Sequence, residues 1–392
     1  MNNQPIKNPT PELVQSLIKH RSPGSVSLYL PIDVGPPASD KNIIQLRKLI
    51  KELNASWDID HESHEGRKAI LDTLQLLTSN PDQLLTDART LAFFACQDQM
   101  ITLALPYTTE ALSRLGGRYC IKPLLPLLYE NPTFTVLCLN LGSVQAYQGS
   151  RTQIQSIEIP NMPSKLEDIT WADDPERSLQ HHTSATNSAE GRPGKSPTHH
   201  IHGQGLPNEL EEHQHRRFFR SIAKAVDNYL TRNDDPLILF GVERNVGLFR
   251  SLHDFKNREI FCEMHNAHGW DSKRVRDEAW KLLKPRSREL VDRKLEAIEA
   301  AEGNHECLHN ISDCVEASAN GRLDLVAIGR DTNVLGLIHR KNGTVSSETH
   351  QEGEQDLLDW IASETILNGG DVVAVDSSQI PGDTCIAAST RY

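Results

Sequence analysis

The segment Leu237-Ile238-Leu239-Phe240-Gly241 decides the fold of this chain. Four large apolar residues in a row, ended by a glycine, are typical of a short strand that is buried on both faces. Apolar residues at helical spacing precede it, from Leu210 to Leu230, and a second helix is expected from about Arg244 to Leu252. A strand between two helices indicates an α/β layer, so we predict an α/β fold.

The same patterns divide the 392 residues into three segments, since domains usually run to roughly 100–200 residues. We expect an N-terminal α/β domain over residues 1–130 and a central α/β domain over 131–285. The central segment contains a long loop, residues 160–206, without sustained periodicity. The third segment, 286–392, has the pattern of an α/β/α sandwich and is expected to begin with a helix from Arg286 to Glu302.

Composition excludes several classes of protein. The net charge of −12 argues against indiscriminate binding to DNA or RNA, although a local basic site remains compatible with it. No apolar run approaches the roughly 20 residues that a membrane-spanning helix needs, and the first residues lack the pattern of a secretory signal. Seven cysteines without a Cys-x-x-Cys pair are typical of buried thiols in a reducing compartment. We therefore expect a cytoplasmic protein without a membrane partner.

Phosphate-binding loops for nucleotides are absent from the sequence. It contains no Gly-x-x-x-x-Gly-Lys-Ser/Thr or Gly-x-Gly-x-x-Gly phosphate loop and no Gly-x-Ser-x-Gly. We expect no cofactor, and a reaction that needs a nucleotide would have to use that of a partner.

Histidines gather in and just after the long loop. Residues 181–225 hold six Lys and Arg side chains against four Glu side chains, a net charge of +2 within an acidic chain. Because phosphates dominate affinity for nucleic acid, such a basic segment is an economical way to contact RNA; a solvated, disordered insertion is the alternative. Seven of the seventeen histidines lie here: His181, His182, His199, His200, His202, His213 and His215.

Within this segment, His202-Gly203-Gln204-Gly205 places a glutamine between two glycines. Glycine permits backbone conformations and close approaches that other residues do not, so the loop can present Gln204 in a crowded site. A basic helix face follows at helical spacing, with the aromatic pair Phe218 and Phe219 on the face expected to be buried. The basic residues of the helix are Arg216, Arg217, Arg220 and Lys224.

A second basic helix is expected over residues 273–294. Contact with RNA and a solvated helix with internal ion pairs are equally good interpretations of it.

The histidines also allow a metal-binding hypothesis. His199-x-x-His202 and His213-x-His215 offer imidazoles, and Glu190 or Asp173 offers a carboxylate. Metal ligands usually lie on rigid elements with supporting neighbours, whereas most of these residues lie in a long loop. No metal is therefore expected.

Several motifs together resemble the bacterial branch of the archaeo-eukaryotic peptide-chain release factor and Pelota superfamily, which includes Balon-like ribosome-binding factors. Each motif is weak alone, but they are spread over the whole chain. They are Ser25 to Pro31, Tyr119 to Leu128, the loop with His202 to Gly205, Asp235 to Val242, and Leu367 to Gly370 with the terminal Arg391-Tyr392.

The resemblance implies an architecture of three domains. The first would be a decoding-side domain, the second a ribonuclease-H-like domain, and the third an α/β/α domain similar to kink-turn-binding ribosomal proteins, which would dock a GTPase.

Release factors of this superfamily carry Gly-Gly-Gln in the central domain, where the glutamine helps to place a water against the peptidyl-tRNA ester. Gly203 and Gln204 match the second glycine and the glutamine, whereas His202 replaces the first glycine. The stop-codon motifs Asn-Ile-Lys-Ser and Tyr-x-Cys-x-x-x-Phe are missing, and Lys41-Asn42-Ile43 is in the wrong order. Codon-specific termination is therefore not expected, and Gln204 is the candidate catalytic residue if the protein hydrolyses peptidyl-tRNA.

The resemblance thus favours a ribosome-binding factor that fills the A site for hibernation or rescue. Its implied partners are the rRNA of both ribosomal subunits and a translational GTPase of the elongation factor Tu class. The candidate rRNA-binding residues are His199, His200, His202, Gly203, Gln204, Gly205, Arg216, Arg217, Arg220 and Lys224. Peptidyl-tRNA hydrolysis and metal binding by the histidine cluster at 181–215 are the alternatives.

Overall fold

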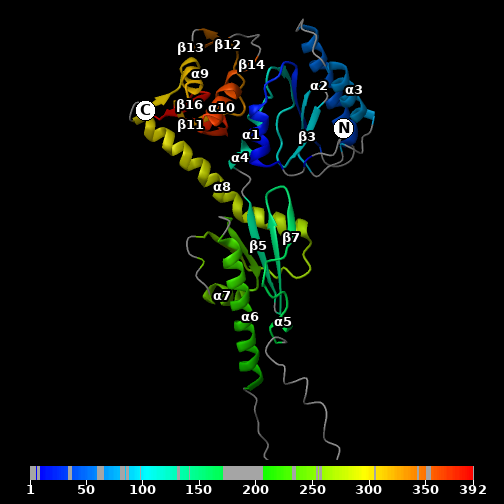
Figure 1. Cartoon of the computed structure of the whole chain (residues 1–392), viewed down its shortest axis with the longest axis vertical. Coiled ribbons are helices and arrows are strands. Elements are labelled where there is room, and N and C mark those ends of the chain that lie inside the picture. Colours follow the sequence, from blue (N-terminus) through cyan, green and yellow to red (C-terminus); the bar gives the residue numbers. More distant parts are fainter. Residues whose placement is uncertain are drawn as a thin grey trace, which may run out of the picture. The chain divides into compact units, whose positions relative to one another are not determined.

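The computed structural model of the chain contains two compact units, Met1–Asn131 with Lys284–Tyr392 (unit 1) and Pro132–Leu283 (unit 2). Figure 1 labels their helices and strands. Both units combine helices with sheets, which confirms the predicted α/β class. The structure describes residues 6, 9–33, 38–59, 66–79, 84, 88–97, 99–129, 133–140, 142–170, 206–231, 235–252, 255, 258–303, 306–341, 344–349 and 355–391.

The N-terminal part of unit 1 is built on an antiparallel sheet of order β3-β2-β1-β4. Successive residues of β1 face opposite sides, as strand geometry requires: Leu28 belongs to the core under α2 and α3, and Tyr29 to the core under α1. The elements are α1 (Pro11–Lys19), β1 (Ser25–Pro31), α2 (Ala38–Ile59), α3 (Arg67–Ser79), β2 (Thr90–Cys96), β3 (Gln99–Leu105), β4 (Leu112–Gly116), η2 (Lys122–Leu124) and α4 (Pro126–Tyr129).

The C-terminal part of unit 1 has a sheet of order β10-β16-β11-β15, in which β11 and β15 are parallel. Helices α9 and α10 pack on one face of this sheet, and the end of α8 packs on the other face through Leu295 and Ile298. A small sheet of order β13-β12-β14 lies beside it. The elements are α8 (Ser272–Gly303), β10 (Cys307–Leu308), α9 (Ile311–Ala319), β11 (Leu323–Gly329), β12 (Leu335–Lys341), β13 (Thr344–Thr349), β14 (Gln355–Asp356), α10 (Leu357–Leu367), β15 (Asp371–Val375), η4 (Ser377–Gln379) and β16 (Ile386–Thr390).

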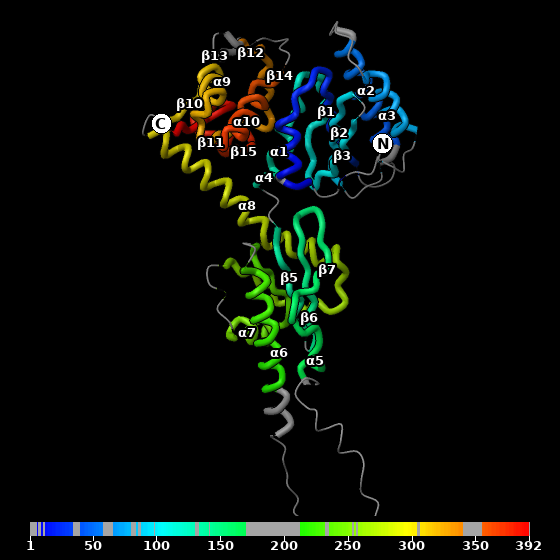
Figure 2. Tube along the Cα trace, viewed as in Figure 1, coloured from blue at the N-terminus to red at the C-terminus, as the bar shows by residue number. Residues whose placement is uncertain are grey.

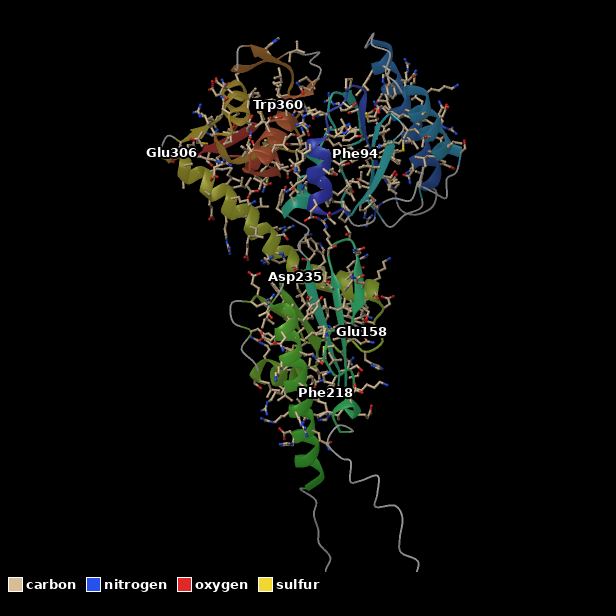
Figure 3. The ribbon with its side chains drawn as sticks, in the orientation of Figure 1. Phe94, Glu158, Phe218, Asp235, Glu306 and Trp360 are labelled. Carbon is tan, nitrogen blue, oxygen red and sulfur yellow. The ribbon has the colours of Figure 1, made fainter. Side chains whose placement is uncertain are left out.

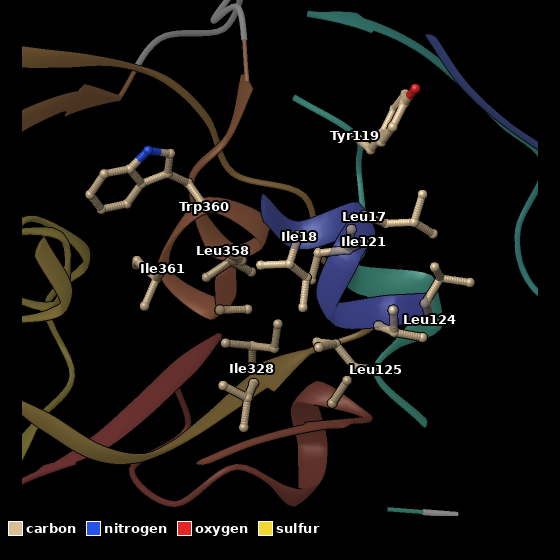
Figure 4. Close-up of a cluster of buried hydrophobic side chains, with 14 of the residues drawn as sticks. Leu17, Ile18, Tyr119, Ile121, Leu124, Leu125, Ile328, Leu358, Trp360 and Ile361 are labelled. Carbon is tan, nitrogen blue, oxygen red and sulfur yellow. The ribbon is translucent and has the colours of Figure 1, made fainter. Parts of the chain in front are cut away.

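The two parts of unit 1 share one hydrophobic core. Leu17 and Ile18 of α1 belong to the same buried cluster as Leu358 of α10 and Ile328 of β11. Figure 4 shows these side chains converging from the two ends of the chain. The expected division into three domains therefore remains a prediction, since the first and third segments pack as one compact unit.

Unit 2 is built on a five-stranded sheet of order β7-β6-β5-β8-β9. Strand β5 is antiparallel to β6 and parallel to β8, and β9 continues parallel to β8. Figure 2 shows α6 and the first turns of α8 on either side of this sheet. The elements are β5 (Phe134–Asn140), β6 (Ser143–Gly149), β7 (Ile154–Ile157), α5 (Glu167–Thr170), α6 (Leu206–Leu230), β8 (Leu237–Gly241), α7 (Glu243–Leu252) and β9 (Ile260–Glu263).

Strand β8 confirms the prediction made from its sequence. Leu237 and Leu239 pack with α6 and α7 on one face of the sheet. Ile238 and Phe240 pack with the start of α8 on the other face. All five residues of the strand are buried.

The expected start of a helix at Arg286 is wrong. A single helix, α8, runs from Ser272 to Gly303 with Pro285 in its interior. Proline removes a backbone donor and usually ends or kinks a helix, which favoured a break there. Helix α8 continues because it is anchored on both sides of the proline, by Leu283 in one core and by Leu295 in another.

Within the described ranges, no helix is long and apolar enough to cross a lipid bilayer.

Candidate functional site

The tip of the predicted site lies outside the described residues, which resume at position 206. This applies to His199, His200, His202, Gly203, Gln204 and Gly205, and to His181, His182, Asp173 and Glu190. Their roles therefore remain predictions.

The basic part of the predicted site lies on α6. Arg216, Arg217, Arg220 and Lys224 are all exposed. At about 100° of rotation per residue, these four positions fall within an arc of about 100° of the helix surface. The opposite face packs into unit 2 through Phe218 and Phe219, which are 0% and 1% exposed; Figure 3 labels Phe218 at this position. The four exposed cations on this arc are called the α6 basic face below.

Few acidic side chains neutralise the α6 basic face. The Arg216 guanidinium lies 3.3 Å from Glu212 Oε1, one turn earlier, and both side chains are about half exposed. Pairs of this kind contribute only a few tenths of a kcal/mol because water and salt screen them. In the described part of the chain, neither Arg220 nor Lys224 has an acidic partner. The face therefore offers a concentrated positive charge to an anionic ligand.

The metal-binding hypothesis loses one of its proposed pairs. His213 and His215 are two residues apart on α6, which places them about 200° apart around the helix. His213 is exposed, whereas His215 is buried. Spacing alone suggested a shared ion, but the helix directs the two imidazoles away from each other. No group of three metal-ligating side chains occurs among the residues that the structure describes.

The cations at the start of α8 are mostly engaged within unit 2. Arg274 lies over the ring of Trp270 at 4.6 Å, and Arg276 donates to the Thr152 carbonyl at 3.2 Å. Lys281 pairs with Glu278 at 2.9 Å. These contacts favour the interpretation of this stretch as a solvated helix with internal ion pairs.

Sequence reasoning missed a buried polar cluster in unit 1. The Lys122 ammonium is 2.5 Å from Asp356 Oδ2, and both side chains are at most 5% exposed. It also donates to the Thr332 carbonyl at 2.6 Å and to Asn333 Oδ1 at 3.0 Å. All three donors of the ammonium are thus used. A single lysine inside the apolar run from Tyr119 to Leu128 was the signal that could have found it.

Asp359 of α10 completes this cluster. Its Oδ1 accepts the backbone N–H groups of Ile121 at 2.7 Å and of Lys122 at 2.5 Å. Burial, and then the negative charge of Asp356, raise the pKa of Asp359 from 3.8 to about 6. These bonds join residues 121–122 to α10 and so connect the two parts of unit 1.

Replacement of Asp359 by asparagine is expected to change how stability depends on pH. Because the folded-state pKa of Asp359 is raised, its protonation stabilises the fold fully below about pH 4, and this contribution is lost as the pH rises through 6. A shift from 3.8 to about 6 corresponds to about 3 kcal/mol. Urea unfolding measures the free energy of unfolding of wild type and of Asp359→Asn at pH 4 and at pH 7. Between these two pH values, wild type should lose about 3 kcal/mol more than the variant. An equal loss in both proteins would contradict the raised pKa of Asp359.

Comparison with known protein families gives a match to the middle of the chain. The model of bacterial archaeo-eukaryotic release factor family 3 matches residues 133–322. This match supports the resemblance to the archaeo-eukaryotic release factor and Pelota superfamily that was found in the sequence. The match covers β5 to β9 and the α6 basic face, and extends to the end of α9. No curated protein matches the sequence.

Several solved structures are similar to the chain. The archaeal translation termination factor aRF1 is 13% identical, with 97% of this chain and 96% of aRF1 covered, at a TM-score of 0.23. Pelota of Archaeoglobus fulgidus is 12% identical, with coverage of 99% and 93% and a TM-score of 0.33. Archaeal Pelota from a model of the ribosome-bound protein with ABCE1 is 11% identical, with coverage of 99% and 95% and a TM-score of 0.37.

Proposed function

We propose that this protein is a ribosome-binding translation factor that occupies the A site, for hibernation or rescue, without codon-specific termination. The observation that carries the proposal is the α6 basic face, an exposed set of four cations in a chain of net charge −12. RNA phosphates are the anions that such a face suits best. The match of residues 133–322 to a release factor family supports the same assignment.

Helix α6, which carries the α6 basic face, follows directly on the His-Gly-Gln-Gly segment in the sequence. In the proposed complex Arg216, Arg217, Arg220 and Lys224 contact rRNA phosphates, and residues 199–205 reach the large-subunit rRNA beyond them. The first segment contacts the small-subunit rRNA. A translational GTPase of the elongation factor Tu class docks on the third segment, in keeping with the absence of a phosphate loop from this sequence.

Co-sedimentation of the full chain with purified ribosomes tests this function. The protein is expected to move into the ribosome fraction at low salt and to be released steeply as salt rises. Four phosphate contacts predict a slope of log affinity against log salt of about −3 to −4, or about a hundredfold loss between 50 and 200 mM. Protein that stays at the top of the gradient, even with ribosomes from stationary cells, would contradict the proposal.

Peptidyl-tRNA hydrolysis is the alternative, and Gly203-Gln204 is the observation that favours it. The same ribosome preparation, loaded with formyl-methionyl-tRNA, separates the two functions. Release of formyl-methionine that is abolished in Gln204→Ala would assign hydrolysis to the protein. Binding without release would leave the A-site factor as its function.

A further inference from the structure

Helices α6 and α7 of unit 2 enclose a pocket of about 280 Å³ beside the α6 basic face. Its lining includes His215 and Arg216 from α6, and Arg244 and Gly247 from α7. Three features of these residues suit the binding of an anionic ligand.

The first feature is a buried histidine without a partner. His215 is only 6% exposed, and its ring has no hydrogen bond to any residue that the structure describes. The ring nitrogens of His215 are not among the fully buried polar atoms that lack a partner, so they reach the surface of the pocket and are available to a ligand. A ring N–H at this position can donate to an anionic oxygen.

The second feature is a glycine within α7. Gly247 lies in the interior of the ten-residue helix Glu243–Leu252, where glycine is less favourable than alanine. A β-carbon at this position would meet no atom within 4 Å, so protein packing does not require the glycine. Its bare backbone leaves space for a ligand to approach the helix closely.

The third feature is the charge of the pocket. Arg216 and Arg244 contribute guanidinium groups from opposite helices, and guanidinium groups bind phosphate through two parallel hydrogen bonds. Glu212 also lines the pocket and pairs with Arg216 at 3.3 Å, but both side chains are more than half exposed. A phosphate can therefore displace this weak pair at little cost. Phe219 supplies an apolar wall.

We propose that this pocket binds a ribose phosphate unit. The phosphate lies between Arg216, Arg244 and His215, and the sugar lies against Phe219 and the backbone of Gly247. The inference rests on the proposed function where the unit is part of rRNA, although a free nucleoside monophosphate presents the same chemistry.

Leucine at position 247 tests the pocket, and leucine at position 303 controls for the substitution itself. Leucine is a better helix former than glycine, and a β-carbon would have no neighbour within 4 Å at Gly247 of α7 or at Gly303 of α8. Gly247→Leu fills the pocket, whereas Gly303 does not line it, so Gly303→Leu leaves the pocket open and is the matched control. The full chain and both variants are titrated calorimetrically with adenosine 5′-monophosphate, adenosine and a uridine hexanucleotide.

Wild type and Gly303→Leu are expected to bind at least one phosphate-bearing probe at least tenfold more tightly than adenosine. Gly247→Leu is expected to lose at least tenfold in that affinity. Binding of the hexanucleotide alone assigns the pocket to RNA, and binding of the monophosphate identifies a free nucleotide as a ligand. Equal affinity for adenosine, no binding of either phosphate probe, or unchanged binding by Gly247→Leu would overturn the proposal. Ribosome co-sedimentation of wild type, measured separately, decides the proposed function whatever the pocket binds.

Discussion

Replacement of Lys122 by alanine is expected to lower the free energy of unfolding by about 3–5 kcal/mol, because it leaves a buried carboxylate without its counter-charge. Asp356 is 6% exposed and lies beside Asp359, which is 7% exposed. Without the ammonium, the two carboxyl groups would repel each other in a site that excludes water. The Thr332 carbonyl and Asn333 Oδ1 would also lose their donor. Urea unfolding followed by far-ultraviolet circular dichroism measures the loss.

Lys48 provides the matched control for Lys122. It pairs with Glu52 at 3.8 Å on α2, but the two side chains are 75% and 51% exposed. Alanine at position 48 is expected to change the free energy of unfolding by less than about 1 kcal/mol. If Lys122→Ala were as mild as Lys48→Ala, the buried cluster would not hold the two parts of unit 1 together.

A double substitution distinguishes the effect of losing the Lys122–Asp356 ion pair from the effect of leaving the Asp356 carboxylate buried without a counter-charge. Buried ion pairs are often replaced by apolar residues at little cost, so Lys122→Met with Asp356→Leu should recover part of the stability lost in Lys122→Ala. Recovery should be incomplete, because Asp356 Oδ1 also accepts the N–H of Leu358 at the start of α10, at 3.1 Å.

Elements with strong local patterns could be predicted from the sequence. The start of α1 has such a pattern, because Thr10 precedes a proline at the first helical position, and Thr10 accepts the Leu13 N–H at 3.3 Å. Strand β8 was predicted from four consecutive apolar residues, which require burial on both faces. The basic face and the buried aromatic face of α6 were also predicted correctly, because the two kinds of residue recur at helical spacing.

Elements that depend on distant partners could not be predicted in this way. Strand β4 (Leu112–Gly116) carries a serine and an arginine, and its residues are only half-buried, so its pattern was too weak before its pairing with β1 was known. The environment of Lys122 depends on residues about 210 to 240 positions away. The pocket between α6 and α7 likewise required the structure, because no motif connects His215 with Gly247.

Neutralising the α6 basic face is expected to weaken ribosome binding about a hundredfold at low salt. In Arg216→Gln with Arg220→Gln and Lys224→Gln, three cations that face solvent are lost. Each phosphate contact that disappears should flatten the slope of log affinity against log salt by about 1, so the triple variant should be about 3 units less steep. Glutamine has nearly the helix propensity of arginine and lysine, so α6 is expected to persist.

A charge-preserving variant decides whether phosphate contact is the cause. Arg216→Lys with Arg220→Lys keeps every positive charge of the face and changes only the geometry of its donors. We expect its affinity to stay within about threefold of wild type and its salt slope to be unchanged, because counterion release depends on charge. If the glutamine variant sediments with ribosomes as wild type does at every salt concentration, α6 does not contact RNA phosphates. The acidic chain must then bind the ribosome through another surface.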